Sequence, residues 1–150
     1  MTIDAVGEWA TSTIAVGEKN NIIMLKETKF PHSVGLLYSS FTYFLGFKVN
    51  SGEYKLMGLA PYGVIGSERV EDYKYKIKKK LVHIKEDGSL WLNLKYFTYT
   101  VGMKMINEKE WQTLFGFPKR LSSDKIEQQH CDLALAIQEI TEEIVIKMAK

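Results

Sequence analysis

The fold is decided by residues 30–63, which read FPHSVGLLYSSFTYFLGFKVNSGEYKLMGLAPYG. This stretch holds two of the three prolines of the chain and a long apolar and aromatic run. Ser33 follows Pro31 and is a favoured N-cap residue, so the sequence predicts a helix from Val34 to about Gly46. That segment is apolar on nearly every face, which is typical of a helix buried on more than one side.

The second half of the stretch places charged residues among glycines. Residues 53–59 predict a shorter helix, which ends at the Ala-Pro-Tyr-Gly sequence that follows. Lysine offers a point charge to phosphate and glycine lets a backbone approach a ligand closely. Glu53 and Lys55, with Gly58 and Gly63, are therefore candidates for holding an anionic or nucleotide ligand. The alternative is a loop–helix–loop with surface charges, and the pattern leaves both open.

Three β-prone runs precede this stretch, at residues 2–6, 10–17 and 21–26, and the third extends to about residue 30. A tight-turn sequence separates the last two, so we expect three successive antiparallel strands. Asp4 then lies at the end of the first strand, and Gly7 follows in a turn. A carboxylate is a hard ligand for a cation, and glycine lets backbone N–H groups reach a phosphate. The alternative is a polar strand end before a turn.

The rest of the chain predicts peripheral elements and one long helix. Residues 67–80 form a charged amphipathic pattern, and residues 81–84 and 90–94 flank an Asp-Gly turn typical of a hairpin. Residues 96–105 predict irregular or extended structure. Asn107 with Glu110 predicts a capping box for a helix to Leu114, and Asp124 with Glu127 predicts the start of the last helix in the same way. The expected apolar stripe of that helix consists of Ile126, Leu133, Ile137, Ile140, Ile144 and Met148.

Composition narrows the class of protein. The chain has 150 residues, a net charge of +2 and one cysteine, Cys131. A single cysteine excludes an internal disulfide framework and indicates a reducing compartment. No apolar run is long enough to cross a bilayer and no signal peptide pattern is present. We therefore expect one cytoplasmic domain that contacts neither membrane nor nucleic acid.

The remaining polar residues predict structural roles. His32, His83 and His130 are spaced too widely for a local zinc motif, so we expect them to be structural histidines. Cys131 has no nearby partner and is expected to be an ordinary helix residue. The basic run from Lys74 to Lys80 predicts a solvated helix face, because no aromatic residues for base stacking are interleaved with it.

Three stretches together resemble the NodU/CmcH/TobZ-type O-carbamoyltransferases. They are residues 4–11, 30–38 and 45–63, in the same order as in that family, and the Gln138-Glu139 region is also similar. The resemblance covers nearly the whole chain. It implies an α/β fold, as part of a ribonuclease-H-like domain of the actin/hexokinase class of ATPases. That domain would begin with an antiparallel three-strand sheet and a buried helix, carry a peripheral insertion at about residues 67–118, and include a long final helix.

The same resemblance implies an activity. Members of that family transfer a carbamoyl group from carbamoyl phosphate, through a carbamoyl-adenylate made with ATP, to a hydroxyl of a small acceptor. It implies ATP and a divalent metal ion as cofactors. Asp4 matches the acidic residue of the family's Asp-Gly-x-Gly-Glu metal motif, in which Ala5 here replaces a glycine and Gly7 is retained. The segment from Glu53 to Gly63 matches the region that faces the nucleotide.

The resemblance also implies that part of the chemistry lies outside these residues. The family's His-x-x-x-His pair precedes its Asp motif, and a glycine-rich segment and a YrdC-type domain follow the last helix. A helical pattern runs to Lys150 without a stop signal, so we expect a piece of a longer protein, inactive alone. The alternative is a non-catalytic binding or interaction module. Exposed apolar surface on such a piece makes homo-oligomerisation an expectation of both hypotheses.

Overall fold

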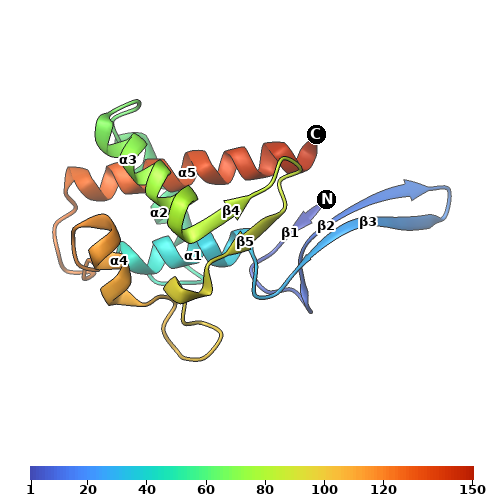
Figure 1. The fold of residues 1–150 in the computed structure, drawn as a ribbon, viewed down its shortest axis with the longest axis horizontal. Coiled ribbons are helices and arrows are strands. Elements are labelled where there is room, and N and C mark those ends of the chain that lie inside the picture. The colour runs from blue at the N-terminus through green and yellow to red at the C-terminus, as the bar shows by residue number, and fades with distance from the viewer.

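Helices and two small antiparallel sheets make up the α/β fold of this chain, as a computed structural model that describes all 150 residues shows (Figure 1). The first sheet has the order β1 (Thr2–Ile3), β2 (Ala10–Glu18), β3 (Asn21–Lys29). The predicted three-strand start is confirmed, although β1 ends at Ile3 instead of continuing to residue 6. Asp4 therefore follows the strand and opens the loop to β2.

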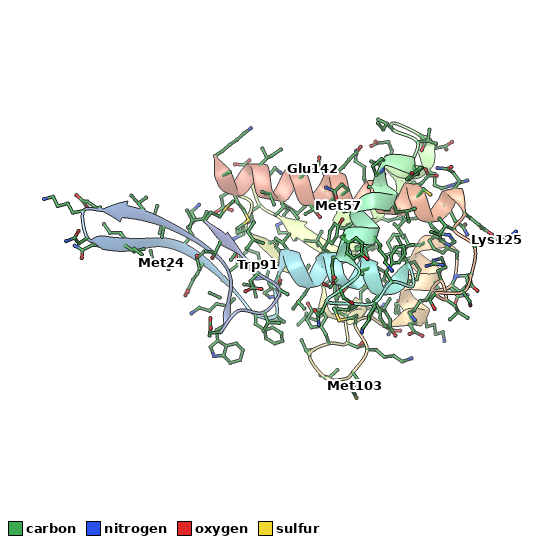
Figure 2. All side chains as sticks on the ribbon, turned by 180° about the vertical axis from the view of Figure 1, so that it is seen from behind. Met24, Met57, Trp91, Met103, Lys125 and Glu142 are labelled. Carbon is green, nitrogen blue, oxygen red and sulfur yellow. The ribbon has the colours of Figure 1, made fainter.

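The β2–β3 hairpin extends away from the helices (Figure 1). Its register pairs Thr13 with Glu27 and Val16 with Ile23. Large apolar side chains on it are exposed to solvent, among them Ile22 at 81% and Leu25 at 57%. Figure 2 shows Met24 on this arm, remote from the helical body. The hairpin thus presents apolar surface that nothing else in these residues covers.

Helix α1 (Val34–Phe44) lies at the centre of the helical body. Its N-cap is confirmed, because the Ser33 hydroxyl accepts a hydrogen bond from the Leu36 N–H. Leu37, Phe41 and Phe44 are fully buried, as the all-round apolar pattern predicted. The helix ends slightly before the predicted Gly46, which adopts a left-handed conformation with φ of 76°.

The next elements pack against both α1 and the last helix. Helix α2 (Glu53–Leu59) has the predicted bounds, and η1 (Ala60–Tyr62) continues it as a 3₁₀ turn through Pro61. Helix α5 (Gln128–Ala149) contacts α1, α2, η1 and α3 (Glu68–Lys76). The chain therefore encloses α1 between the short helices and α5.

The predicted helix over residues 67–80 is partly wrong. Ser67 does cap α3, but the α-helix ends at Lys76 and a wider π turn, η2 (Ile77–Leu81), follows. Ile77 and Leu81, at the two ends of this turn, are both fully buried. Strands β4 (Val82–Ile84) and β5 (Leu90–Leu92) then form the predicted hairpin.

The predicted start of α4 (Glu108–Phe115) is confirmed, and only its capping box needs correction. Asn107 caps α4, which follows η3 (Leu94–Tyr96), by accepting from the Glu110 N–H. The reciprocal half of the capping box is absent, because the Glu110 carboxylate pairs with Lys95 and the Asn107 N–H donates to the Tyr96 carbonyl.

Helix α5 begins at Gln128 instead of near Asp124. Asp124 closes a turn with Leu121, and Glu127 is the N-cap residue, whose N–H donates to His130 Nδ1 at 2.9 Å. Ile126 consequently lies before the helix and is 48% exposed, so it does not belong to the apolar stripe. The other predicted stripe residues are buried.

Aromatic rings fill the centre of the core between α1 and α4. Trp111 of α4 is fully buried, and its ring centroid lies 4.7 Å from that of Phe41 and 5.3 Å from that of Phe44. Phe115 and Phe117 extend the cluster toward α5. No helix of the chain has the length and apolar character needed to cross a membrane.

Candidate functional site

The loop that follows β1 is docked on the N-terminal end of α1. The Asp4 N–H donates to the Thr11 carbonyl at 2.8 Å, and the Ser33 hydroxyl donates to the Asp4 carbonyl at 3.0 Å. Gly35 permits this approach, since a Cβ there would lie 2.7 Å from the Cα of Ala5. The N-cap residue of α1 thus holds both its own helix and the loop that carries Asp4.

The Asp4 carboxylate itself faces solvent. Its Oδ1 accepts the N–H of Ala5 at 2.7 Å, and its other oxygen has no protein partner. Gly7 turns the loop with φ of 57°, and a Cβ there would lie 2.3 Å from the Ala10 carbonyl oxygen. The geometry leaves one carboxylate oxygen free for a cation. No group of three or more His, Cys, Asp or Glu side chains gathers around it, so these residues would supply a single ligand.

Glu53 is committed to the protein. Its Oε1 accepts from the Ser39 hydroxyl at 2.8 Å and from the Asn50 N–H at 2.9 Å, and its Oε2 accepts from the Gly52 N–H at 3.1 Å. The carboxylate therefore joins the first turn of α2 to the middle of α1 and orders the loop between them. The sequence predicted that Glu53 could help to hold a ligand. In the structure its carboxylate instead accepts hydrogen bonds from the loop that precedes α2.

The pKa of Glu53 reflects two opposed influences. Partial burial favours the neutral acid and acts to raise the pKa. The hydrogen bonds donated by the Asn50 N–H, the Ser39 hydroxyl and the Gly52 N–H favour the carboxylate and outweigh burial. The pKa of Glu53 consequently lies below its ordinary value.

We expect Glu53→Gln to lower the free energy of unfolding by about 1–2 kcal/mol at neutral pH, because an amide cannot accept all three hydrogen bonds. A depressed pKa stabilises the fold above the pKa of the unfolded chain, and this contribution is lost as pH falls through the folded value. The difference between wild type and variant should therefore shrink below about pH 4.3. Urea titrations across pH measure it.

Glu86 provides the matched control, since it is an exposed carboxylate without a hydrogen-bond partner. Glu86→Gln should leave the stability within about 0.5 kcal/mol of wild type at every pH. Equal effects of the two substitutions would show that the Glu53 hydrogen bonds do not order the loop.

The other candidates from residues 53–63 lie on two different surfaces. Lys55 is exposed on α2, with its ammonium 5.9 Å from the centroid of the Tyr54 ring and no carboxylate partner. Gly58 is exposed on the same helix, and a Cβ there would meet nothing within 4 Å. Figure 2 shows Met57 on the outer surface of α2. Gly63 instead packs against α5, where a Cβ would lie 2.6 Å from the Cβ of Leu135.

The structure thus places the candidates at two points along α1. The loop of Asp4 and Gly7 lies at the N-terminal end of α1, where Ser33 donates a hydrogen bond to the Asp4 carbonyl. Glu53 contacts Ser39, which lies six residues after Ser33 in the chain. A rise of 1.5 Å per residue separates those two contact points by about 9 Å along the helix axis. No hydrogen bond or ion pair joins Asp4 to Lys55.

A polar connection that sequence reasoning missed lies beside Glu53. The Tyr38 hydroxyl donates to Gln138 Oε1 at 2.8 Å, and Gln138 Nε2 donates to Glu142 Oε1 at 2.9 Å. Burial, with the nearby charges of Glu142 and Glu53, raises the pKa of Tyr38 to about 12. The signal in the sequence was the spacing of Gln138 and Glu142, which lie four residues apart and so on one face of the last helix.

Two of the three histidines and most of the basic run have internal partners, and the cysteine is buried. His32 Nδ1 accepts the Leu92 N–H at 3.1 Å, and burial lowers the pKa of His32. Cys131 is buried in α5, and burial raises the pKa of its thiol. Lys74 and Lys78 reach across to Glu139 and Glu143 of α5. His83 and two further lysines of the run, Lys79 and Lys80, are exposed.

Comparison with known proteins agrees with the resemblance of the three stretches. A protein of Synechocystis sp. described as uncharacterized is 46% identical over 148 residues, which are 99% of this chain and 23% of that protein. The nodulation protein NolNO of Sinorhizobium fredii is 29% identical over 150 residues, which are 100% of this chain and 19% of that protein. The chain therefore spans about a quarter or less of the length of these relatives.

A family model adds the most direct evidence. The model described as Carbamoyltransferase N-terminus matches residues 1–150, which include both the loop of Asp4 and the helix of Lys55. Because this match extends over the whole chain, the chain belongs to the carbamoyltransferase N-terminus family.

Proposed function

We propose that this chain forms part of an O-carbamoyltransferase that moves a carbamoyl group from carbamoyl phosphate, through a carbamoyl-adenylate made with ATP, to a hydroxyl of a small acceptor. The observation that carries the proposal is the family match over residues 1–150. The likeness to a nodulation protein supports it. We also propose that the protein is cytoplasmic and forms a homo-oligomer.

The transfer step balances without an oxidant or reductant. The hydroxyl oxygen of the acceptor attacks the carbamoyl carbon and forms the new C–O bond. The bond from that carbon to the adenylate phosphate oxygen breaks, AMP leaves, and the hydroxyl proton is released. Positive charge and backbone donors that face the phosphate stabilise the negative charge of the departing group.

Residues of this chain would contribute to binding and orientation. Lys55 offers an uncompensated ammonium beside the open backbone of Gly58, which suits a phosphate. Glu53 orders the loop that precedes this helix. Gly7 shapes the loop of Asp4, whose free oxygen would hold a divalent metal ion together with ligands from outside these residues. A bound metal would supply positive charge to the reacting phosphate.

We also propose that the chain is a single domain, residues 1–150, that forms part of a ribonuclease-H-like fold with a peripheral insertion at about residues 67–118. The exposed apolar side chains of the β2–β3 hairpin support this proposal. Relatives four or more times longer have enough additional chain to cover that surface. The same hairpin is the observation that favours the alternative function, an interaction module.

Calorimetric titration of the chain with ATP and Mg²⁺ tests the proposal. We expect saturable binding that weakens about tenfold in Lys55→Gln, because a charge-assisted hydrogen bond to phosphate is lost. Lys79→Gln removes the same charge from another exposed lysine and should leave binding unchanged. We expect no phosphate release from ATP and carbamoyl phosphate by the chain alone.

Several outcomes would contradict this assignment. Absence of binding to the wild-type chain would favour the interaction module. Equal binding by Lys55→Gln and wild type would remove Lys55 from the nucleotide site. Sustained turnover by these residues alone would overturn the expectation that the chain is inactive without the rest of a longer protein.

A further inference from the structure

A pocket lies at the C-terminal end of α1, where the chain turns away from the helix. Its volume is about 880 Å³, within the range of small-molecule sites. Its walls come from three segments that lie far apart in the sequence, at residues 43 and 46–50, at residues 103 and 105, and at residues 119–123. None of the residues to which the proposed carbamoyl-transfer chemistry assigns a role lines it, so the two assignments can fail separately.

Three cations and no carboxylate line this pocket. They are Lys48, Lys119 and Arg120. Neither lysine forms an ion pair, and the Lys119 ammonium lies 4.2 Å from the centroid of the Tyr43 ring. The carboxylate of Glu108, outside the lining, is occupied by the Tyr43 hydroxyl and by Lys104. Lys48 therefore has no acidic partner, while Lys119 lies near Glu108, whose pKa is lowered by the Tyr43 hydroxyl, by Lys104 and by the charge of Lys119.

The Arg120 side chain is fixed in position at this pocket. It is only 6% exposed, and Nε donates to the Leu45 carbonyl at 2.7 Å while Nη1 donates to the Asp124 carbonyl at 2.6 Å. Nη2 has no hydrogen-bond partner in the protein. Because no fully buried side-chain nitrogen or oxygen lacks a hydrogen-bond partner, Nη2 must be accessible to solvent. The guanidinium is thus held rigidly by two carbonyl groups and keeps a donor at the pocket surface.

The commonplace interpretation of Arg120 is that it only caps α1. A cation near the last carbonyl groups of a helix is favourable, and the bond to Leu45 fits that role. Capping does not require Lys48 or Lys119, which come from different segments and form no ion pair. Two hydroxyl groups, of Ser122 and Ser123, also line the same pocket and are available as donors.

The other side of the pocket is apolar. Phe47 lies under the Arg120 guanidinium, with 5.2 Å from its ring centroid to Cζ, and Met105 and Leu121 also line the walls. Figure 2 shows Met103, whose side chain is fully exposed, at the tip of the loop beside them. A ligand with an apolar body and an anionic end would satisfy both sides.

We propose that this pocket binds a small organic anion, with its phosphate or carboxylate group on Arg120, Lys119 and Lys48 and its apolar part against Phe47 and Met105. Charge-assisted bonds from a rigid guanidinium favour planar carboxylate and phosphate oxygens. Phosphate and carboxylate groups share this chemistry, and their relative affinities distinguish them.

The probe for this site is phenyl phosphate, titrated into the ¹⁵N-labelled chain while amide shifts are recorded. We expect saturable shifts at residues 46–50 and 119–123. Benzyl alcohol, which has the ring without the charge, should bind at least about tenfold more weakly. Phenylacetate and inorganic phosphate are the comparison arms: tighter phenyl phosphate identifies the phosphate group, and tighter phenylacetate identifies the carboxylate.

Lys48→Gln and Lys119→Gln should each weaken phenyl phosphate about fivefold or more, since each removes one charge from the site. Lys125→Gln is the matched control, because Lys125 is exposed outside the pocket lining (Figure 2) and should not matter. The proposed site would be wrong if the shifts spread over lysines elsewhere or if binding did not saturate up to roughly 10 mM. Equal affinity in all three variants would also contradict it.

Discussion

Trp111→Ala is expected to lower the free energy of unfolding by about 3–5 kcal/mol, enough to remove much of the stability of a small domain. The indole is fully buried and packs against rings from α1, η3–α4 and α4 itself. Its Nε1–H donates to the Tyr96 carbonyl at 2.9 Å. Alanine would leave a large cavity and remove the indole hydrogen bond from the Tyr96 carbonyl, which keeps only the Asn107 N–H. Urea unfolding followed by far-ultraviolet circular dichroism measures the loss.

Trp9 supplies the control for this substitution. It is 68% exposed, so Trp9→Ala should change stability by no more than about 0.5 kcal/mol. Trp111→Phe should fall between the two, since phenylalanine restores most of the packing but not the hydrogen bond to Tyr96. Similar losses in Trp111→Ala and Trp9→Ala would mean that α4 does not pack on α1 as described.

Asp132→Ala is expected to cost about 3 kcal/mol, because removal of a buried, bonded carboxylate leaves its donors without a partner. Asp132 is 2% exposed in α5. Its Oδ1 accepts from the Val64 N–H at 3.0 Å and from Gln128 Nε2 at 2.9 Å, and its Oδ2 accepts from Arg69 Nη1 at 3.0 Å. The carboxylate thus fastens α3 and the loop before it to α5.

Two further variants separate charge from hydrogen bonding at this position. Asp132→Asn keeps an acceptor for the Val64 N–H and should lose only about 1 kcal/mol, because Arg69 is half-exposed and can return to water. Asp72→Ala removes an exposed carboxylate paired with Lys76 and should lose no more than about 0.5 kcal/mol. Equal urea midpoints for Asp132→Ala and Asp72→Ala would contradict the structural role of Asp132.

Local signals allowed much of the fold to be predicted. Ser33 and Gly46 mark the ends of α1, and the Asp87-Gly88 turn marks the β4–β5 hairpin, where Gly88 adopts φ of 79°. These residues act on backbone within a few positions of themselves, so the sequence is sufficient. The start of α5 was misplaced because two acidic residues three apart offered the same local signal, and only the His130 ring, which accepts the Glu127 N–H, distinguishes them.

The candidate site was only partly accessible from the sequence. Asp4 and Gly7 lie in the loop that the pattern indicated, and Lys55 is exposed on the predicted helix. The partners of Glu53 were not predictable, because Ser39 reaches it from a different helix. The same is true of Tyr38 and Gln138, which lie 100 residues apart in the chain.

The sequence by itself determined the strands of the first hairpin, the position of α1 and α2, and the family resemblance, since each depends on residues that are close together in the chain. The tertiary structure alone decided that Glu53 builds a loop, that Asp132 fastens α3 to α5, and that Arg120 meets Lys48 at one pocket. Those outcomes depend on which distant side chains packing brings close together. For Asp132, burial makes the partners essential, because a polar group removed from water must find another within the protein.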